Sequence, residues 1–227
     1  MTLVRLWAYL AGICLLHAAE KPLDMPAAAK GYLPVGWKVE TLVQGDLNAD
    51  GLSDLAFVRV GTDSKKITKR SDGFAQDRNP RVLVVLLARK EGYAKVGEYL
   101  KFIPPAFEDE YENLLDRYDG LKLEKGVLVV CFQWFVTAGS WSVGEWQHKF
   151  RLEAGRLRLI GTEHNIFMRN SGEKTLTSTN YLTGKRKITS GLNQFDDEPS
   201  RPKVEWEALD SKKPIFIEDL PPIGREE

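Results

Sequence analysis

Short alternating segments separated by glycine turns run through most of this chain of 227 residues. Apolar and polar side chains alternate within each segment, as expected for strands that bury one face and expose the other. Two-residue turns such as Lys125-Gly126, Ala154-Gly155 and Thr183-Gly184 join these segments. Glycine at such positions permits the positive φ that tight hairpins require. The pattern therefore predicts a mainly β protein built from antiparallel hairpins.

The turns and polar stretches set the bounds of the expected strands. Residues 81–88 (RVLVVLLA) are nearly all apolar, which favours a strand buried on both faces. One short helix is expected after Pro105, because apolar residues between 107 and 118 fall at helical spacing. The expected strands cover residues 37–43, 55–60, 81–88, 93–101, 121–123, 127–136, 146–152, 156–160, 175–182, 185–189 and 204–209, and a short segment at 214–217 closes the domain.

The length and the hairpin pattern favour one β-rich domain over residues 37–222, with at most one short helix. A sandwich and an incomplete propeller-like stack of hairpins both fit this pattern. A complete propeller is not favoured, because the sequence contains no repeat of fixed period. Residues 62–80 are polar and are expected to form a long, mobile hairpin loop.

The N-terminus has the pattern of a secretory signal peptide over residues 1–19. Arg5 supplies a positive charge, residues 6–16 are apolar, and Ala18-Ala19 offers a cleavage site. The apolar run is too short to anchor the chain across a bilayer. We therefore expect an exported protein, periplasmic or extracellular, with no membrane span in the mature chain. Residues 20–36, rich in proline and alanine, are expected to form a loosely ordered leader.

Charge and cysteine content narrow the function classes. The whole chain has a formal net charge of zero, which argues against a nucleic-acid partner because phosphate binding needs a basic surplus. Cleavage after residue 19 removes Cys14 and leaves Cys131 as the one remaining cysteine. An internal disulfide is then impossible, so the fold must depend on its core and on any bound metal.

The segment GDLNADGLSDLAFV, residues 45–58, gathers oxygen-bearing side chains directly before an expected strand. Calcium takes six to eight oxygen ligands, and a tight loop supplies them from alternate residues. Gly51, at the sixth position, allows the sharp turn. An EF-hand would need glutamate at the twelfth position, where this chain has Phe57. The predicted ligands are the side chains of Asp46, Asn48, Asp50 and Asp54 and the carbonyl of Leu52.

This spacing, D-x-N-x-D-G-x-x-D followed by L-A-F-V, resembles the calcium loop of integrin-alpha-type repeats, also called FG-GAP or VCBS-like repeats. The resemblance implies a loop that joins two antiparallel strands and holds a structural calcium ion. The wider chain resembles a group of exported bacterial proteins of unassigned function, which implies no activity. The alternative is a metal-free hairpin held by Asx turns, although three clustered negative charges repel one another without a cation.

Candidates for a catalytic site are few. Cys131 and His148 form one conceivable nucleophile–base pair, but each is better explained as a core residue, and His148 is expected on the apolar face of its strand. The acidic run at 108–112, which includes Glu108 and Glu112, is better explained as a solvated helix face than as glycosidase carboxylates. His164 is expected in a turn. Trp141 lies in a loop that contains glycines and is the best candidate for an exposed ligand contact.

Three hypotheses for function follow. The favoured one is a non-enzymatic exported binding or structural module with one structural calcium ion and an unknown protein or glycan partner. The second is a periplasmic inhibitor or immunity protein that acts against a secreted hydrolase. The third is a glycan-active enzyme that uses acidic residues. The absence of a catalytic constellation in the sequence favours the first two, so an enzyme is the less favoured reading.

Overall fold

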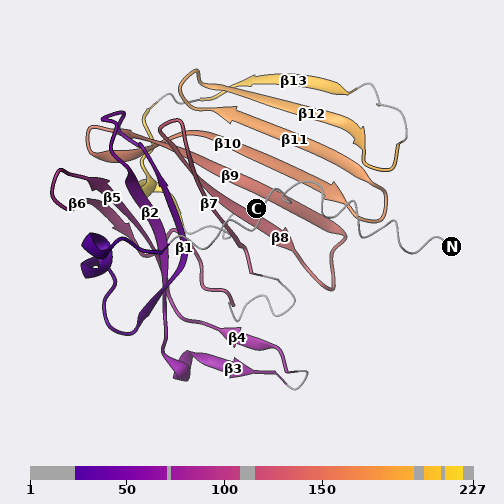
Figure 1. Cartoon of the computed structure of the whole chain (residues 1–227). Coiled ribbons are helices and arrows are strands. Elements are labelled where there is room, and N and C mark those ends of the chain that lie inside the picture. Colours follow the sequence, from indigo (N-terminus) through magenta and orange to yellow (C-terminus); the bar gives the residue numbers. More distant parts are fainter. Residues whose placement is uncertain (1–23, 71–72, 108–115, 197–201, 211–212, 222–227) are drawn as a thin grey trace.

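The computed structural model describes residues 24–70, 73–107, 116–196, 202–210 and 213–221, and two antiparallel sheets account for most of them (Figure 1). The smaller sheet has the strand order β1-β2-β5-β6 and the larger has the order β13-β12-β11-β10-β9-β8-β7. The strands of the smaller sheet are β1 (Trp37–Gly45), β2 (Asp54–Gly61), β5 (Arg81–Ala88) and β6 (Tyr93–Tyr99). Those of the larger sheet are β7 (Tyr118–Glu124), β8 (Val127–Phe135), β9 (Ser142–Glu153), β10 (Arg156–Met168), β11 (Glu173–Asn180), β12 (Lys185–Asn193) and β13 (Lys203–Ala208).

The two sheets pack face to face as a β sandwich, which decides between the two architectures expected from the sequence. Alternate residues of β2 and β5 point into the core between the sheets, among them Ala56, Val58 and Leu83. The opposing residues come from β7, β8, β9 and β10, including Leu128 and Phe150, both 0% exposed. Strands β11 to β13 extend beyond this contact (Figure 1). The alternation of side chains between the two faces of each strand therefore decides which residues enter the core.

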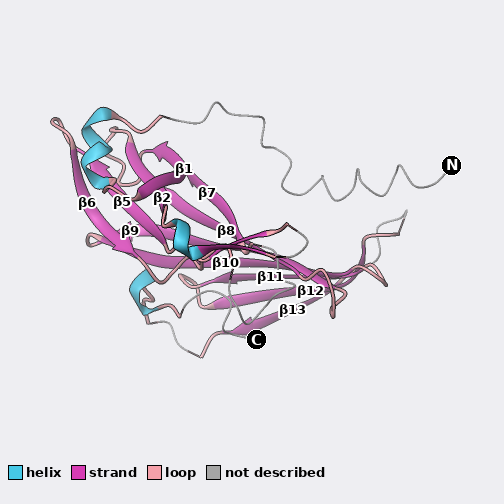
Figure 2. Ribbon diagram, turned by 90° about the horizontal axis from the view of Figure 1, so that it is seen from below, coloured by secondary structure: helices cyan, strands magenta, loops and turns pink. Residues whose placement is uncertain are grey.

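Strand β5 is buried on both faces, as the apolar run RVLVVLLA predicts. Leu83 and Val85 face the seven-stranded sheet, whereas Val82 and Val84 face the opposite side. This opposite side is covered by the 3₁₀ helix η1 (Ala27–Tyr32), which Figure 2 shows beside the four-stranded sheet.

The segment expected to be a loosely ordered leader is structured where it is described. Ala29 of η1 is 0% exposed. The Tyr32 hydroxyl donates to the carbonyl of Tyr93 at 2.8 Å, and Arg59 donates to the carbonyl of Tyr32 at 2.6 Å. The apolar outer face of β2 and β5 needs a cover, and η1 supplies it. The signal peptide expected at residues 1–19 lies outside the described residues.

The polar segment 62–80 contains regular structure that the sequence did not indicate. It forms the short 3₁₀ helix η2 (Ser64–Lys66) and a hairpin of β3 (Ile67–Lys69) and β4 (Ala75–Asp77), which projects at the bottom of Figure 1. Asn79, 1% exposed, fastens the base of this hairpin. Its side chain accepts a hydrogen bond from the amide of Asp63 and donates one to the carbonyl of Asp63, both at 3.0 Å.

The expected turn at His164 is wrong, and most of the expected helix after Pro105 lies outside the described residues. His164 lies within β10 and not in a turn, because β10 pairs with β9 and β11 as far as Met168 and Phe167, respectively. Most of the expected helix after Pro105 lies at residues 108–115, outside the described residues, and Tyr118 begins strand β7.

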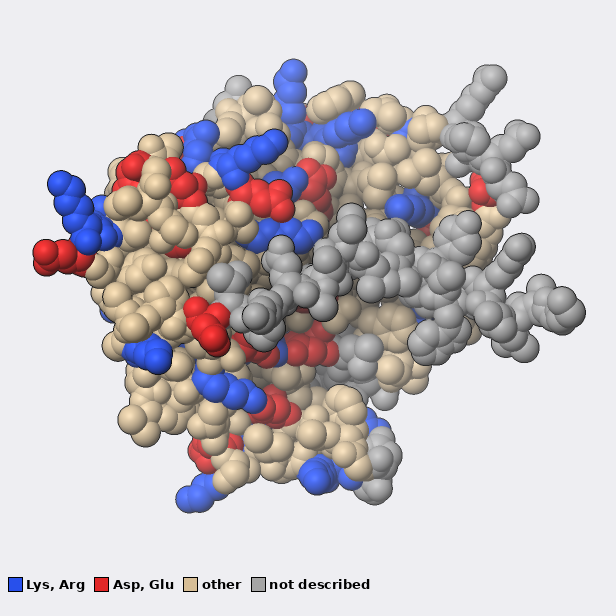
Figure 3. Space-filling model, in the orientation of Figure 1, with Lys and Arg blue, Asp and Glu red and all other residues tan. Residues whose placement is uncertain are grey.

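Basic and acidic side chains lie side by side on the face shown in Figure 3. Within the described part of the chain, no helix is long and apolar enough to cross a membrane.

His148 lies on the core face of β9, opposite Val130 of β8 and Thr162 of β10. Its ring contacts those of Phe102, Phe132 and Phe150, with centroid distances between 5.7 and 6.3 Å. Its Nδ1 atom is buried and makes no hydrogen bond. Burial, helped by the nearby His164, lowers the pKa of His148 to about 4, so the imidazole is neutral at pH 7.

This burial predicts a pH dependence of stability. Below the unfolded-state pKa of about 6.5 the unfolded chain binds a proton that folded His148 does not. The free energy of unfolding should therefore fall by roughly 3 kcal/mol as the pH drops from about 6.5 to about 4. Urea denaturation of the protein and of His148→Phe across this range measures the effect. The variant should lose that part of the pH dependence, and equal slopes in the two proteins would contradict the assignment.

Candidate functional site

The loop predicted to bind calcium joins β1 to β2 at one end of the sandwich. Gly45, the last residue of β1, pairs with Asp54, the first residue of β2, so the intervening eight residues form a closed turn. Two of them have positive φ: Ala49 at 61° and Gly51 at 81°. Glycine accepts this conformation at low cost, which explains the glycine at position 51.

The acidic and amide side chains of the loop fold back on its own backbone. Both oxygens of the Asp46 carboxylate accept amide hydrogens, from Asp50 at 3.1 Å and from Gly51 at 2.8 Å. Asn48 accepts from the amide of Asp50 at 3.1 Å, and Asp50 accepts from the amide of Leu52 at 2.8 Å. These are Asx-type turns, in which a side chain takes the place of a backbone acceptor. The alternate spacing of the polar residues therefore shapes the loop by itself.

Asp50 is held in its ionised form. Hydrogen bonds from the amide of Leu52 and the side chain of Asn48, together with the charge of Arg89, lower the pKa of this carboxyl below its ordinary value. Each of these contacts favours the charged form. The loop consequently presents a stable negative charge at its exposed rim.

Asp54 occupies a different environment from the other carboxylates of the loop. It is 0% exposed. Its two oxygens accept hydrogen bonds from the amides of Leu47, at 2.8 Å, and Ala88, at 2.7 Å. Asp54 therefore ties the start of the loop and the end of β5 to the start of β2, and a buried carboxylate is tolerated because backbone donors satisfy both oxygens.

The loop also rests on the seven-stranded sheet. Leu47, 4% exposed, inserts into the core between the sheets. The β7–β8 turn lies close by, since a side chain at Gly126 would come within 3.7 Å of the Leu47 carbonyl. Gly45 faces Leu123 of β7 so closely that an added Cβ would lie 2.9 Å from its side chain. The loop is thus a point of contact between the two sheets.

The oxygen atoms of this loop are of the types that calcium binds. Carboxylate, amide and carbonyl oxygens are the ligands that calcium takes, and each carboxylate oxygen that accepts one N–H keeps a second lone pair. Within the described part of the chain, no three His, Cys, Asp or Glu side chains are grouped as a metal site requires. Asp50 is exposed and Asp46 and Asn48 are half-buried at the rim of the loop, whereas Asp54 is fully buried beneath it.

Trp141, the predicted ligand contact, is 59% exposed. Arg169 holds the loop that carries it: the guanidinium lies 5.7 Å from the Trp141 ring and 4.6 Å from the Phe135 ring. Arg169 also donates to the carbonyls of Val136, at 3.0 Å, and Ser140, at 2.7 Å. The exposed indole therefore stands on a fastened loop, with an apolar surface open to solvent.

The structure separates the conceivable Cys131–His148 pair. Cys131 is opposite Gln147 on β9 and His148 is opposite Val130 on β8, so their side chains point to opposite faces of the sheet. Burial raises the pKa of the Cys131 thiol, which disfavours the reactive thiolate. The acidic run at 108–112 lies outside the described residues.

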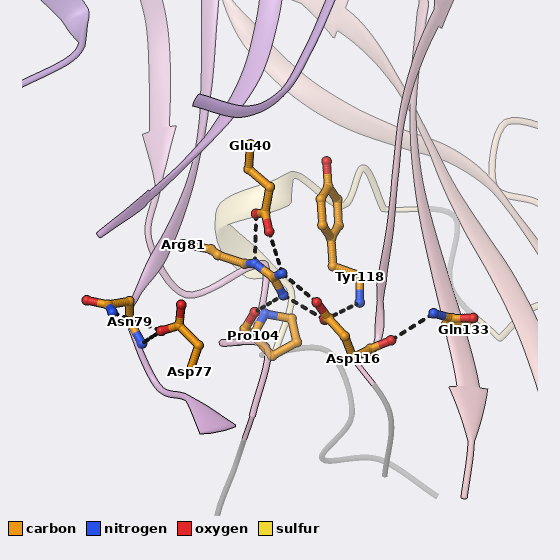
Figure 4. Close-up of polar contacts among 8 residues, drawn as sticks. All are labelled: Glu40, Asp77, Asn79, Arg81, Pro104, Asp116, Tyr118 and Gln133. Carbon is orange, nitrogen blue, oxygen red and sulfur yellow. Dashed lines mark hydrogen bonds and ion pairs between the residues drawn. The ribbon is translucent and has the colours of Figure 1, made fainter. Parts of the chain in front are cut away.

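A polar cluster around Arg81, missed in the sequence, joins the two sheets (Figure 4). Arg81 is 3% exposed, yet each of its five N–H donors has an acceptor. Nε and Nη2 donate to Glu40 at 2.8 and 2.6 Å, Nη1 and Nη2 donate to Asp116 at 2.7 and 2.5 Å, and Nη1 also donates to the carbonyl of Pro104 at 3.2 Å. Figure 4 shows Glu40 and Asp116 approaching the guanidinium from two sides.

Local structure positions each partner of Arg81. Glu40 stands at the irregularity in β1 between Val39 and Thr41, and such a bulge redirects a side chain. Asp116 precedes β7 and also accepts from the amide of Tyr118 at 3.1 Å. Burial alone would lower the pKa of Arg81, but the hydrogen bonds to Asp116 and Glu40 reverse this and raise it. The only signal in the sequence was an arginine at the start of an apolar strand.

No protein-family model, curated protein or solved structure matches this chain. Its function is therefore inferred from its own residues and their geometry.

The Arg81 cluster predicts a large stability loss on substitution. Arg81→Met should lower the free energy of unfolding by about 3–5 kcal/mol, because removing one partner leaves the others desolvated without compensation. Arg151→Met is the matched control, since Arg151 pairs with Glu153 but is 46% exposed, and it should cost less than about 1 kcal/mol. Urea denaturation monitored by circular dichroism compares the two. Similar losses would mean that the cluster adds nothing beyond a surface ion pair.

Proposed function

We propose that this protein is an exported, non-enzymatic binding or structural module whose β1–β2 loop binds a structural calcium ion. The observation that supports the proposal best is the arrangement of Asp46, Asn48 and Asp50. Their oxygens are gathered at the rim of a turn whose shape is already fixed by its own hydrogen bonds. A preformed turn loses little conformational entropy when it takes up an ion.

The residues that would hold the ion are the side chains of Asp46, Asn48 and Asp50 and the carbonyl of Leu52. Asp54 would offer the lone pairs that its two backbone bonds leave free. The lowered pKa of Asp50 means that its carboxylate keeps its negative charge at more acidic pH than an ordinary aspartate. Bound calcium would neutralise the repulsion among the carboxylates.

A structural role fits the position of this loop. It contacts the turn between β7 and β8, so stabilising it would also support the packing of the two sheets. Exported calcium sites often have Kd values of about 10⁻⁴–10⁻³ M. At about 1 mM calcium, such a site would stabilise the fold by roughly 0.4–1.4 kcal/mol. For a domain of this size the melting temperature would rise by roughly 1–5 °C.

A calcium titration of the mature protein, residues 20–227, tests this proposal. The melting temperature should rise saturably from its value in EGTA. Asp46→Asn and Asp50→Asn should abolish the rise, because each removes a charged ligand. Asp63→Asn is the matched control: Asp63 also accepts a backbone hydrogen bond in a turn, from Lys65 at 2.9 Å, but lies outside the loop, so it should leave the rise unchanged.

The contrary outcomes of the titration are distinct. A full rise in Asp46→Asn and Asp50→Asn would place the ion elsewhere. No rise in the unsubstituted protein would mean that the loop is a metal-free hairpin. Asp54→Asn should lower the melting temperature in EGTA as well, because Asp54 is also an internal hydrogen-bond acceptor.

A second candidate function is recognition of a glycan or of a protein through Trp141. A secreted hydrolase that this protein inhibits would be one such protein partner. The exposed indole, fastened by Arg169, favours this candidate. A flat aromatic ring offers a stacking surface at low entropic cost.

Titration with a panel of soluble oligosaccharides, followed by tryptophan fluorescence, tests the glycan form of this candidate. Binding should be lost in Trp141→Ala and retained in Trp206→Ala, whose indole is equally open at 65% exposure. Binding that survives in Trp141→Ala would exclude Trp141 as the contact. If neither the unsubstituted protein nor Trp206→Ala bound any of the oligosaccharides, glycan recognition would be excluded.

A further inference from the structure

Strand β13 forms one edge of the seven-stranded sheet (Figure 1). It pairs with β12 on one side, and no described strand pairs with its other side. All six of its residues are exposed. An edge of this kind presents a row of backbone donors and acceptors to any strand that approaches it.

The direction of each backbone group on β13 follows from one hydrogen bond. The amide of Leu209 donates to the carbonyl of Gly184 at 2.9 Å. Hydrogen-bonded positions alternate along an antiparallel pair, so Glu207, Glu205 and Lys203 also direct their amides and carbonyls towards β12. The amides and carbonyls of Val204, Trp206 and Ala208 therefore point away from the sheet.

The backbone of β13 is regular along its whole pairing with β12. The pairing of β12 with β13 runs without a register shift from Lys203 to Ala208. By contrast, β6, an edge of the smaller sheet, is interrupted by a bulge against β5. Bulges and twists blunt an edge, so β13 is the more regular template.

The side chains of β13 form two unlike faces. Val204 and Trp206 project on one face and are 45% and 65% exposed. Lys203, Glu205 and Glu207 project on the other, and their side chains are 70%, 50% and 50% exposed. The sequence Lys-Val-Glu-Trp-Glu is thus charged at both ends of one face, with opposite sign, and apolar on the other.

We propose that two copies of this chain pair through β13, antiparallel about a two-fold axis at Glu205. In this register Lys203 lies opposite Glu207 of the partner copy, and Val204 lies opposite Trp206 of the partner copy. The outward amide and carbonyl of Val204 then exchange two hydrogen bonds with those of the opposite Trp206, as the antiparallel ladder requires. The two seven-stranded sheets become one continuous sheet.

Charge selects this register from its symmetric neighbours. A two-fold axis at Trp206 would set Glu205 opposite Glu207 twice, and like charges directly opposite are destabilising. An axis at Val204 would bring in Pro202, which has no amide hydrogen to donate. The register centred on Glu205 has two Lys–Glu pairs and a single Glu–Glu contact. The Lys203 ammonium of the same chain, 2.6 Å from Glu205, reduces the repulsion at that contact.

Light scattering coupled to gel filtration, over a range of concentrations, tests the pairing. The mass should rise from that of one chain towards twice that value. Trp206→Pro should abolish the rise, because it removes an outward amide and the apolar contact. The same amide is not used by β12, so the fold should survive, as circular dichroism would show.

A charge exchange tests the register itself. Lys203→Glu and Glu207→Lys should each weaken the dimer roughly tenfold, since each sets like charges opposite one another twice. The double variant should recover the original affinity, because it restores opposite charges. A register centred on Trp206 would instead be strengthened by Glu207→Lys. A chain that stays monomeric at every concentration, or a dimer indifferent to Trp206→Pro, overturns the proposal.

Discussion

One buried guanidinium links parts of the chain that are distant in sequence. Arg81 begins β5, a strand buried on both faces, and its carboxylate partners come from β1 and from the segment that leads into β7. Burying an arginine is tolerable only when all of its donors are satisfied. The hydrogen bonds of Arg81 therefore constrain the bulge at Glu40, the path of the chain at Pro104 and the entry into the second sheet together. The face-to-face packing of the apolar strands then supplies the bulk of the core.

The same requirement, that a buried charged group must be fully hydrogen-bonded, applies to a carboxylate of the β1–β2 loop. Asp54 is a buried carboxylate whose oxygens accept hydrogen bonds from backbone amides, whereas Asp46 and Asp50 lie at the rim of the loop. The loop is thus anchored in the core at one end and exposed at the other. This division, with one end buried at the junction of the two sheets and the other at the surface, is the basis of the proposed calcium site.

The two proposed surfaces lie towards opposite edges of the seven-stranded sheet. The loop of the proposed calcium site contacts the β7–β8 hairpin, and β13 is the far edge of the same sheet. A dimer formed through β13 would leave the β1–β2 loop of each copy open to solvent. The proposed ion binding and the proposed self-association would therefore be separable, because they use opposite edges of the sheet.

The sequence alone indicated most of the strands, the tight turns and the acidic loop, because these depend on neighbouring residues. Alternation predicts which side chains share a face, and the run RVLVVLLA predicts a strand buried on both sides, as the structure shows. What the sequence did not indicate depends on contacts between distant residues. The cover that η1 provides, the extension of β10 through His164 and the partners of Arg81 each require a segment far away in the chain. Local patterns specify which faces need partners, and only tertiary packing decides which residues become those partners.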